Sequence, residues 1–265
     1  MKLGVPSKGR LKKEVLSWFN HKGVEIITSE DDRSYAAKVT GFSDIQLFFL
    51  PPVEIPTLLS KGVLDLGVTG QDLIEEKIPE WDKYVTELIK LGIGHADLVI
   101  AVPEFWIDVS NLEDLDEVAK IFRNKMGFRL RIATKYHNLA RKYLKKFGIT
   151  DYMLIDSQGA TEGLIKNEVA EVVIDITSTG QTFKSNNLKI LPIDPIKKSE
   201  VALFASLKRK QKIMLDQNKS FFKKPCAISL ASIPSKLVVE KILNFVFPNK
   251  YTDLPKFFQL LFVHE

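Results

Sequence analysis

The chain has 265 residues, of which 45% are hydrophobic and 27% are charged, a balance typical of a globular protein with one substantial core or two modest ones. No stretch approaches the roughly 18 consecutive apolar residues of a membrane span, and the start of the chain has no apolar signal-peptide block. The single cysteine, Cys226, excludes an internal disulfide and a multi-cysteine metal site, so we expect a cytoplasmic protein.

The net charge of +5 is unevenly distributed along the chain. Residues 208–265 hold 11 Lys and Arg against 4 Asp and Glu, which leaves 27 against 29 in residues 1–207. Because a nucleic-acid partner needs a basic surface on the folded core, the near-neutral main body argues against such a partner.

Short strand-like runs alternate with helix-like runs in residues 1–94, and this alternation predicts a first α/β lobe. In chain order the runs are LGVP at 3–6, an amphipathic helix at 11–21, VEIIT at 24–28, IQLFFL at 45–50, a segment at 52–59, VLDLGVTG at 63–70 and a run at 84–91.

The pattern restarts at residue 95 and predicts a second α/β lobe over residues 95–186. Its runs are a strand at 95–102, a helix at 112–122, RIAT at 131–134, a basic helix at 139–147, YMLID at 152–156, a helix at 161–166 and EVVID at 171–175. Two more strand-like runs, at 187–193 and 200–206, are expected to return to the first lobe and make it discontinuous.

Residues 207–265 form a basic C-terminal extension rich in Lys, Asn, Phe and Ile. Its clearest feature is an apolar pattern of helical period at 234–247, so we expect the extension to be at least partly helical.

The run VVIDITSTGQT, residues 172–182, begins as a buried strand and ends in a hydroxyl-rich loop before a helical stretch. Backbone N–H groups at a helix start point at an anion, and Gly180 lets the main chain approach it closely. Asp175, at the carboxyl end of the strand, is placed to accept hydrogen bonds from sugar hydroxyls. The alternative is a turn that only caps a helix. The hydroxyl donors of the predicted phosphate loop are Thr177, Ser178, Thr179 and Thr182.

Two basic positions lie in loops of the first lobe. Lys8 and Arg10 flank Gly9 in a turn between a strand and a helix, where two cations can clamp a polyphosphate. Arg33 lies in the run DDRSY. The alternative for Lys8 and Arg10 is an ordinary turn exposed to solvent. The alternative for Arg33 is a loop arginine whose charge is neutralised by Asp31 or Asp32.

Two glycine-containing loops complete the set of candidate ligand loops. Thr69 and Gly70 end a strand, and loops at such positions line the ligand crevice of open α/β sheets. Glu162 lies in the loop GATEG at 159–163. The alternatives are a helix N-cap at Thr69 and, for Glu162, a favourable charge at a helix N-terminus. No group of residues has metal-ligand spacing.

Five motifs, in this order and spacing, resemble the ATP phosphoribosyltransferase family of histidine biosynthesis, over residues 1 to about 206. They are PSKGR at 6–10, DDRSY at 31–35, DLGVTGQDLIEE at 65–76, RIATKY at 131–136 and VIDITSTGQTFKSNNL at 173–188.

The resemblance implies a two-lobed α/β fold of the periplasmic-binding-protein type (type II), with the active site in the cleft between the lobes. It implies condensation of ATP with 5-phosphoribosyl 1-diphosphate, giving N1-(5-phosphoribosyl)-ATP and diphosphate, with Mg²⁺ carried by the substrate and no metal ligand assigned to the protein.

The same resemblance implies roles for individual residues. The 5-phosphate is assigned to the loop from Thr177 to Thr182, including Gln181, and the ribose hydroxyls to Asp175. Lys8, Arg10 and Arg33 are assigned as catalytic cations that face the diphosphate and the ATP phosphates. We place Thr69, Gly70 and Glu162 in the ATP and substrate cleft.

Two departures from the family pattern stand out. Ala96 and Asp97 replace a cysteine and a basic residue that many members carry. Residues 208–265 do not match the histidine-binding domain of long-form members, so the resemblance is to a short-form enzyme. That form implies a histidyl-tRNA-synthetase-like regulatory subunit and a homodimer or hetero-oligomer.

Two other functions remain open from the sequence. One is another purine or pyrimidine phosphoribosyltransferase, although Ile174 and Ile176 replace the acidic neighbour usual in that motif. The other is a non-catalytic two-lobed solute-binding or sensor module, which explains the fold but not the coexistence of the basic positions with the STGQT loop.

Overall fold

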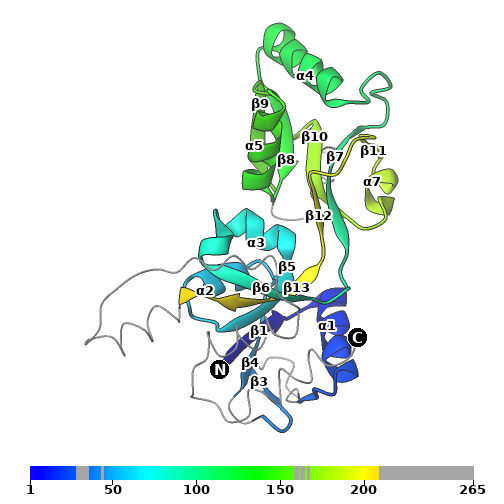
Figure 1. The fold of residues 1–265 in the computed structure, drawn as a ribbon. Coiled ribbons are helices and arrows are strands. Elements are labelled where there is room, and N and C mark those ends of the chain that lie inside the picture. Colours follow the sequence, from blue (N-terminus) through cyan, green and yellow to red (C-terminus); the bar gives the residue numbers. More distant parts are fainter. Residues whose placement is uncertain (28–35, 43–44, 158–160, 162–164, 166–167, 209–265) are drawn as a thin grey trace, which may run out of the picture. The chain divides into compact units, whose positions relative to one another are not determined.

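The computed structural model describes residues 1–27, 36–42, 45–157, 161, 165 and 168–208. The chain divides into two compact units, residues 1–94 with those from 201 onward, and residues 95–200. Each unit is built on its own mixed sheet with helices against it (Figure 1), so the prediction of two α/β lobes is confirmed. The helix expected at 234–247, like the rest of the C-terminal extension beyond residue 208, lies outside the described residues. Within the described ranges, no helix has the length and apolar character needed to cross a membrane.

The first unit contains a seven-stranded sheet in the order β2-β3-β4-β1-β5-β13-β6. β1 pairs in parallel with β4 and β5, whereas β13 runs antiparallel to β5 and β6. The strands are β1 (Lys2–Pro6), β2 (Ile26–Ile27), β3 (Ala36–Val39), β4 (Gln46–Leu50), β5 (Leu66–Gly70), β6 (Val85–Lys90) and β13 (Val201–Ser206).

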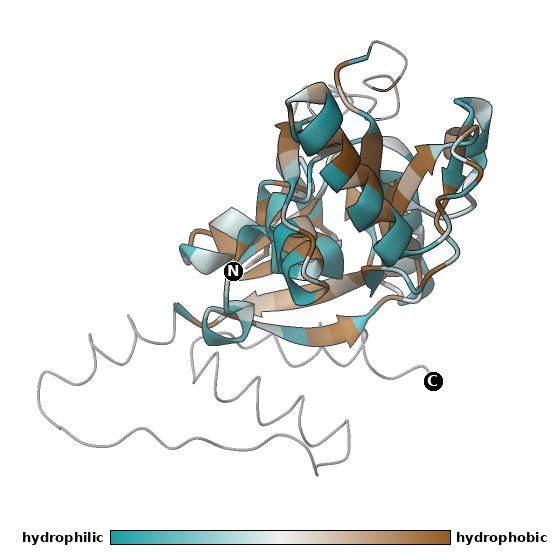
Figure 2. Cartoon of the chain, turned by 90° about the horizontal axis from the view of Figure 1, so that it is seen from above, coloured by the Kyte–Doolittle hydropathy of each residue, from teal (hydrophilic) through white to brown (hydrophobic). Residues whose placement is uncertain are grey.

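Helices cover both faces of this first sheet. Successive residues of a strand point to opposite faces, and in β13 Leu203 packs in the cluster that contains Phe19, whereas Phe204 packs in the cluster that contains Ile55. The strands carry much of the hydrophobic colour in Figure 2, as this burial requires. The helices are α1 (Gly9–His21), α2 (Ile55–Ser60), α3 (Gln71–Lys77) and the 3-10 turn η1 (Trp81–Lys83).

The second unit contains a sheet in the order β11-β7-β10-β8-β9, with β12 also paired to β7. β8 is parallel to β9 and β10, and β7 is antiparallel to β10, β11 and β12. The strands are β7 (Ala96–Pro103), β8 (Leu130–Thr134), β9 (Tyr152–Asp156), β10 (Val172–Thr177), β11 (Leu188–Ile190) and β12 (Lys197–Ser199). The helices are α4 (Leu112–Ile121), the π-helical turn η2 (Phe122–Met126), α5 (His137–Lys146) and α7 (Gln181–Ser185).

The strand after α7 does not return to the first unit. Residues 187–193 and 200–206 were both expected to join the first sheet. Instead, β11 pairs with β7 in the second sheet, where Leu188 lies opposite Pro103. The expectation is therefore wrong for the first of these runs. Only β13 joins the first sheet, where it lies between β5 and β6. The second unit extends to residue 200 because β11 and β12 both complete the pairing of the long strand β7.

Gly67 allows α2 to pack closely on β5, the strand that ends with Thr69 and Gly70. A Cβ atom at this position would lie 2.5 Å from Ile55 Cγ2 and 2.9 Å from Leu59 Cδ1, and both of these side chains are fully buried. A larger residue therefore requires these two side chains, or the helix that carries them, to shift.

We expect Gly67→Ala to lower the free energy of unfolding by about 1–3 kcal/mol, the usual cost of overpacking a core. Denaturant unfolding measures this change. In a double-mutant cycle with Ile55→Ala, the penalty of Gly67→Ala should shrink, because one of the two close contacts is removed. An unchanged midpoint for the single variant contradicts the close packing of α2.

Candidate active site

The carboxyl ends of three parallel strands lie at one edge of the second sheet. β8 lies between β9 and β10, with Thr134 opposite Asp156 on one side and next to Ile174 on the other. The loops that follow these strands therefore leave the sheet at the same edge, which is where open α/β sheets bind ligands. The predicted phosphate loop is one of the three.

Asp175, at the end of β10, is a buried carboxylate with an exposure of 8%. Its Oδ1 accepts a 2.8 Å hydrogen bond from the N–H of Ile176, and its Oδ2 accepts one from the hydroxyl of Thr161. The hydroxyl of Ser157 lies 2.6 Å from that of Thr161 and, because Thr161 donates to Asp175, acts as the donor to it. A buried charge needs such partners, and here they hold the carboxylate in a fixed position.

Lys135 places a cation beside this carboxylate. Its Nζ lies 3.7 Å from Asp175 Oδ2, and 45% of its side chain is exposed. Lys135 and Thr161 were not among the residues predicted for the site. The signal for Lys135 was its position directly after RIAT, a strand whose carboxyl end lies next to that of β10.

The loop between β10 and α7 has the composition predicted for it and is held by its own side chains. The Thr177 hydroxyl accepts a 2.8 Å hydrogen bond from the N–H of Gly180, which has a φ of +71°. The Thr179 hydroxyl accepts a 3.4 Å bond from the N–H of Gln181. These two N–H groups are thus used within the loop. The exposed side chains of the loop are those of Ser178, Thr179, Gln181 and Thr182.

Asp97 adds a second carboxylate to this part of the sheet. It lies directly opposite Thr177 across the antiparallel pair of β7 and β10, and such opposed side chains share a face of the sheet. On the other side of β7, Asp97 lies opposite Lys198. The departure from the family pattern at this position therefore falls next to the phosphate loop.

The basic turn of the first unit projects into solvent. Lys8 is the N-cap of α1, with an extended backbone and an exposed side chain. Arg10 Nε lies 3.2 Å from Glu14 Oε1 while 71% of the Arg10 side chain stays exposed. Gly9, between them, has a φ of +70°, a value that side chains with a Cβ rarely adopt. The two cations therefore project from a turn that requires glycine.

Thr69 and Gly70 were predicted to lie in a loop, but they are the last two residues of β5, and α3 follows directly at Gln71. This end of β5 lies at the same edge of the first sheet as the basic turn, since β1 and β5 are parallel neighbours. The Thr69 side chain is fully buried and its hydroxyl donates a 3.0 Å hydrogen bond to the carbonyl of Pro52, so its contact within this unit is structural. The N-cap of α3 is Gly70 and not Thr69.

Two predicted site residues, Arg33 and Glu162, lie outside the described residues. In the part of the chain that the structure describes, no three His, Cys, Asp or Glu side chains come together as a set of metal ligands.

Residues 51–222 match the family model of ATP phosphoribosyltransferase, HisG. The ATP phosphoribosyltransferase of Cereibacter sphaeroides is 51% identical over 206 residues, which are 78% of this chain and 87% of that protein. That of Mesorhizobium japonicum is 44% identical over 207 residues, 78% of this chain and 89% of the relative. Both relatives are thus shorter than this chain.

Among solved structures, the chain is similar to the ATP phosphoribosyltransferase (HisG:HisZ) complex from Thermotoga maritima. The TM-score is 0.59 at 25% sequence identity, and the match covers 81% of this chain and 92% of that chain. The family model, the relatives and the hydroxyl-rich loop beside a buried aspartate agree. The chain belongs to the ATP phosphoribosyltransferase family and catalyses the first step of histidine biosynthesis.

Proposed function

We propose that the edge of the second sheet binds the phosphoribosyl group of 5-phosphoribosyl 1-diphosphate. The loop from Thr177 to Thr182 holds the 5-phosphate through its exposed hydroxyls, and Asp175 accepts hydrogen bonds from the ribose hydroxyls. The observation that supports this proposal is the fixed carboxylate of Asp175 at the end of β10, directly before the hydroxyl-rich loop. A cis-diol needs an acceptor held in place, and Asp175 is one.

Lys135 extends this proposed site. Its Nζ, 3.7 Å from Asp175 Oδ2, provides a positive charge at the same edge of the sheet. A substrate with phosphates at both ends of the ribose presents several negative oxygens, and a half-exposed lysine can attract one of them while its contact with Asp175 persists. We therefore add Lys135 to the proposed ligand contacts, with Thr161 as a positioning residue for Asp175.

In the reaction, a ring nitrogen of adenine forms a bond to the anomeric carbon of the ribose. The bond from that carbon to the diphosphate oxygen breaks, and diphosphate leaves with the electron pair. Negative charge grows on the leaving group, so cations placed there stabilise the transition state more than the ground state. We propose this role for Lys8, Arg10 and Arg33, whose charges also face the ATP phosphates.

ATP contacts are proposed for Thr69 and Gly70, at the end of β5, and for Glu162. Gly70 presents main chain at the start of α3, whereas the buried Thr69 hydroxyl, bonded to the carbonyl of Pro52, positions the end of the strand. No covalent nucleophile is required by this scheme, since catalysis comes from holding the adenine and the ribose in line.

Mg²⁺ is proposed to arrive on the diphosphate of the substrate. Mg²⁺ commonly keeps several waters and binds substrate phosphates together with one or two carboxylates, so a cage of protein ligands is not needed.

The purified protein should form N1-(5-phosphoribosyl)-ATP and diphosphate from ATP, 5-phosphoribosyl 1-diphosphate and Mg²⁺, and excess chelator should abolish product formation. Chromatography of the nucleotide product and a diphosphate assay measure this outcome. Full activity in chelator contradicts the proposed role of Mg²⁺, and restoration by added Mg²⁺ is the control.

Thr179→Val should raise the KM for 5-phosphoribosyl 1-diphosphate about ten- to hundredfold, the usual effect of losing a hydrogen bond to a charged group. Its hydroxyl makes only a 3.4 Å bond within the loop, so stability should change little. Thr86→Val, in β6 of the first unit, makes the same chemical change as a control. Unchanged kinetics for Thr179→Val in a folded protein remove that residue from the phosphate site.

We also propose a cytoplasmic enzyme that works with a histidyl-tRNA-synthetase-like regulatory subunit. Two observations support this proposal and the short form: the Thermotoga maritima protein is described as a HisG:HisZ complex, and 78% of this chain covers 87% of the Cereibacter sphaeroides relative. We propose a homodimer or a hetero-oligomer with this subunit, and both assemblies have a mass above that of one chain.

Co-expression with the HisZ-type subunit of the same genome should give a mixed assembly that elutes as one species, and this assembly should be more active than the chain alone. Size-exclusion chromatography with light scattering and an activity assay of each peak test this expectation. Separate elution of the two proteins, with equal activity in both experiments, contradicts the partnership and leaves the catalytic proposal intact.

A further inference from the structure

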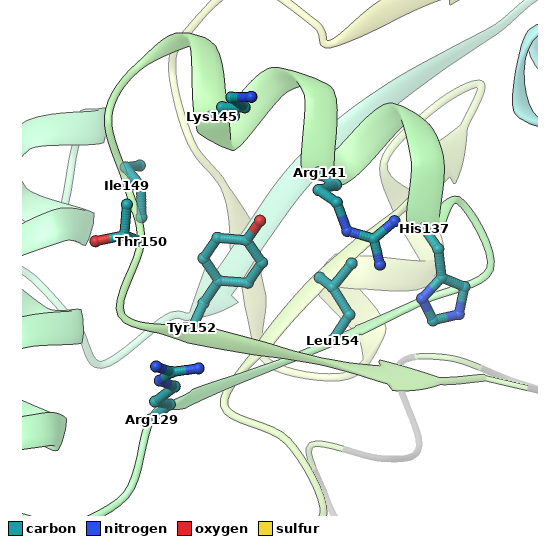
Figure 3. A pocket seen from close by; sticks show the side chains of 8 residues that line it. All are labelled: Arg129, His137, Arg141, Lys145, Ile149, Thr150, Tyr152 and Leu154. Atoms are coloured by element: carbon teal, nitrogen blue, oxygen red, sulfur yellow. The ribbon is translucent and has the colours of Figure 1, made fainter. Parts of the chain in front are cut away.

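A hollow of about 540 Å³ lies between α5 and the edge strand β9 in the second unit (Figure 3). From α5 it is lined by His137, Arg141 and Lys145. These residues are four positions apart, so they form one stripe along a single face of the helix. The volume falls within the range of small-molecule sites.

The opposite side of the hollow comes from β9 and the residue before β8. Tyr152 and Leu154 are two positions apart on β9 and therefore point to the same face of the sheet. Figure 3 shows the Tyr152 hydroxyl pointing toward α5, and Arg129, the residue before β8, completes the lining. The hollow thus combines an apolar floor and an aromatic ring with basic side chains.

Two of the acidic residues near this hollow pair with basic side chains. Asp156 pairs with His137 at 3.1 Å. Glu171 pairs with Arg131, and this hydrogen bond is the main cause of the raised pKa of Arg131.

Three cations are left facing the hollow. Arg129, Arg141 and Lys145 are exposed and form no ion pair with any described residue of the chain. Three like charges around one hollow repel one another, and an anion with several oxygens relieves this repulsion. Arginine gives planar, two-point hydrogen bonding to phosphate oxygens, and lysine adds a compact charge. A second copy of the chain docked at this edge of the sheet would add the same three positive charges and increase the repulsion, so it does not fit this surface.

We propose that this hollow is a second anion site, which binds a polyphosphate chain between the stripe on α5 and Arg129. It contains none of the residues assigned to the catalytic site. A nucleoside polyphosphate and free inorganic polyphosphate share this chemistry. The Tyr152 ring offers a stacking surface for a base. Only the nucleoside polyphosphate has a base, so this ring distinguishes the two ligands.

Isothermal titration of the full-length protein with inorganic tripolyphosphate tests the site. Arg141→Glu/Lys145→Glu should weaken this binding at least about tenfold, whereas Lys142→Glu/Lys146→Glu should leave it within about twofold. The two double variants change the same net charge on the same helix, but Lys142 and Lys146 do not line the hollow. Both should retain the kcat and KM of the parent for ATP and 5-phosphoribosyl 1-diphosphate. If the first variant fails to fold, Arg141→Gln/Lys145→Gln replaces it.

A second titration uses GTP. Tighter binding of GTP than of tripolyphosphate, with the gain lost in Tyr152→Ala, identifies a nucleoside polyphosphate as the source, and equal binding identifies the free chain. Equal weakening by both double variants shows diffuse attraction and overturns the proposal. Binding that is unchanged by Arg141→Glu/Lys145→Glu, or that fails to saturate below about 1 mM, also overturns it.

Discussion

The candidate site depends on one constraint, the burial of the Asp175 carboxylate at the end of β10. A charge with 8% exposure is stable only when its oxygens are hydrogen bonded, and the donors come from the next residue of the same strand and from the hydroxyl of Thr161. Lys135 adds a cation from the loop after β8. The loops after β8 and β9 therefore meet at this carboxylate of β10, and they can do so because β8, β9 and β10 are parallel and end at one edge.

Much of this architecture is predictable from local sequence patterns. The amphipathic run at 11–21 corresponds to α1, which begins two residues earlier, and the basic run at 139–147 corresponds to α5 at His137–Lys146. Side-chain periodicity determines these elements, so the sequence is enough to find them. The STGQT loop was likewise identifiable, because glycine and hydroxyl residues directly after a buried strand form a pattern that short-range chemistry explains.

The contacts between residues that are far apart in the sequence were not predictable. Residues 188–190 have a strand pattern, but nothing local specifies that they pair with β7. The pairing of Lys135 with Asp175 joins the residue after β8 to a residue of β10, and the hydroxyl of Thr69 donates to the carbonyl of Pro52. The two alternative functions, another phosphoribosyltransferase and a sensor, were excluded by the family match over residues 51–222 and by the relatives.

The insertion of β13 between β5 and β6 limits when the first sheet can be completed. Among the strands that the structure describes, β6 pairs with β13 alone, and this pairing needs the chain to have been made as far as residue 206. The intervening unit, residues 95–200, is continuous and can fold first. When it does, Ala96 and Ser199 lie opposite each other in the β7 and β12 pair, which brings together the ends of a loop of more than a hundred residues. Early folding of the second unit thus lowers the entropy cost of completing the first.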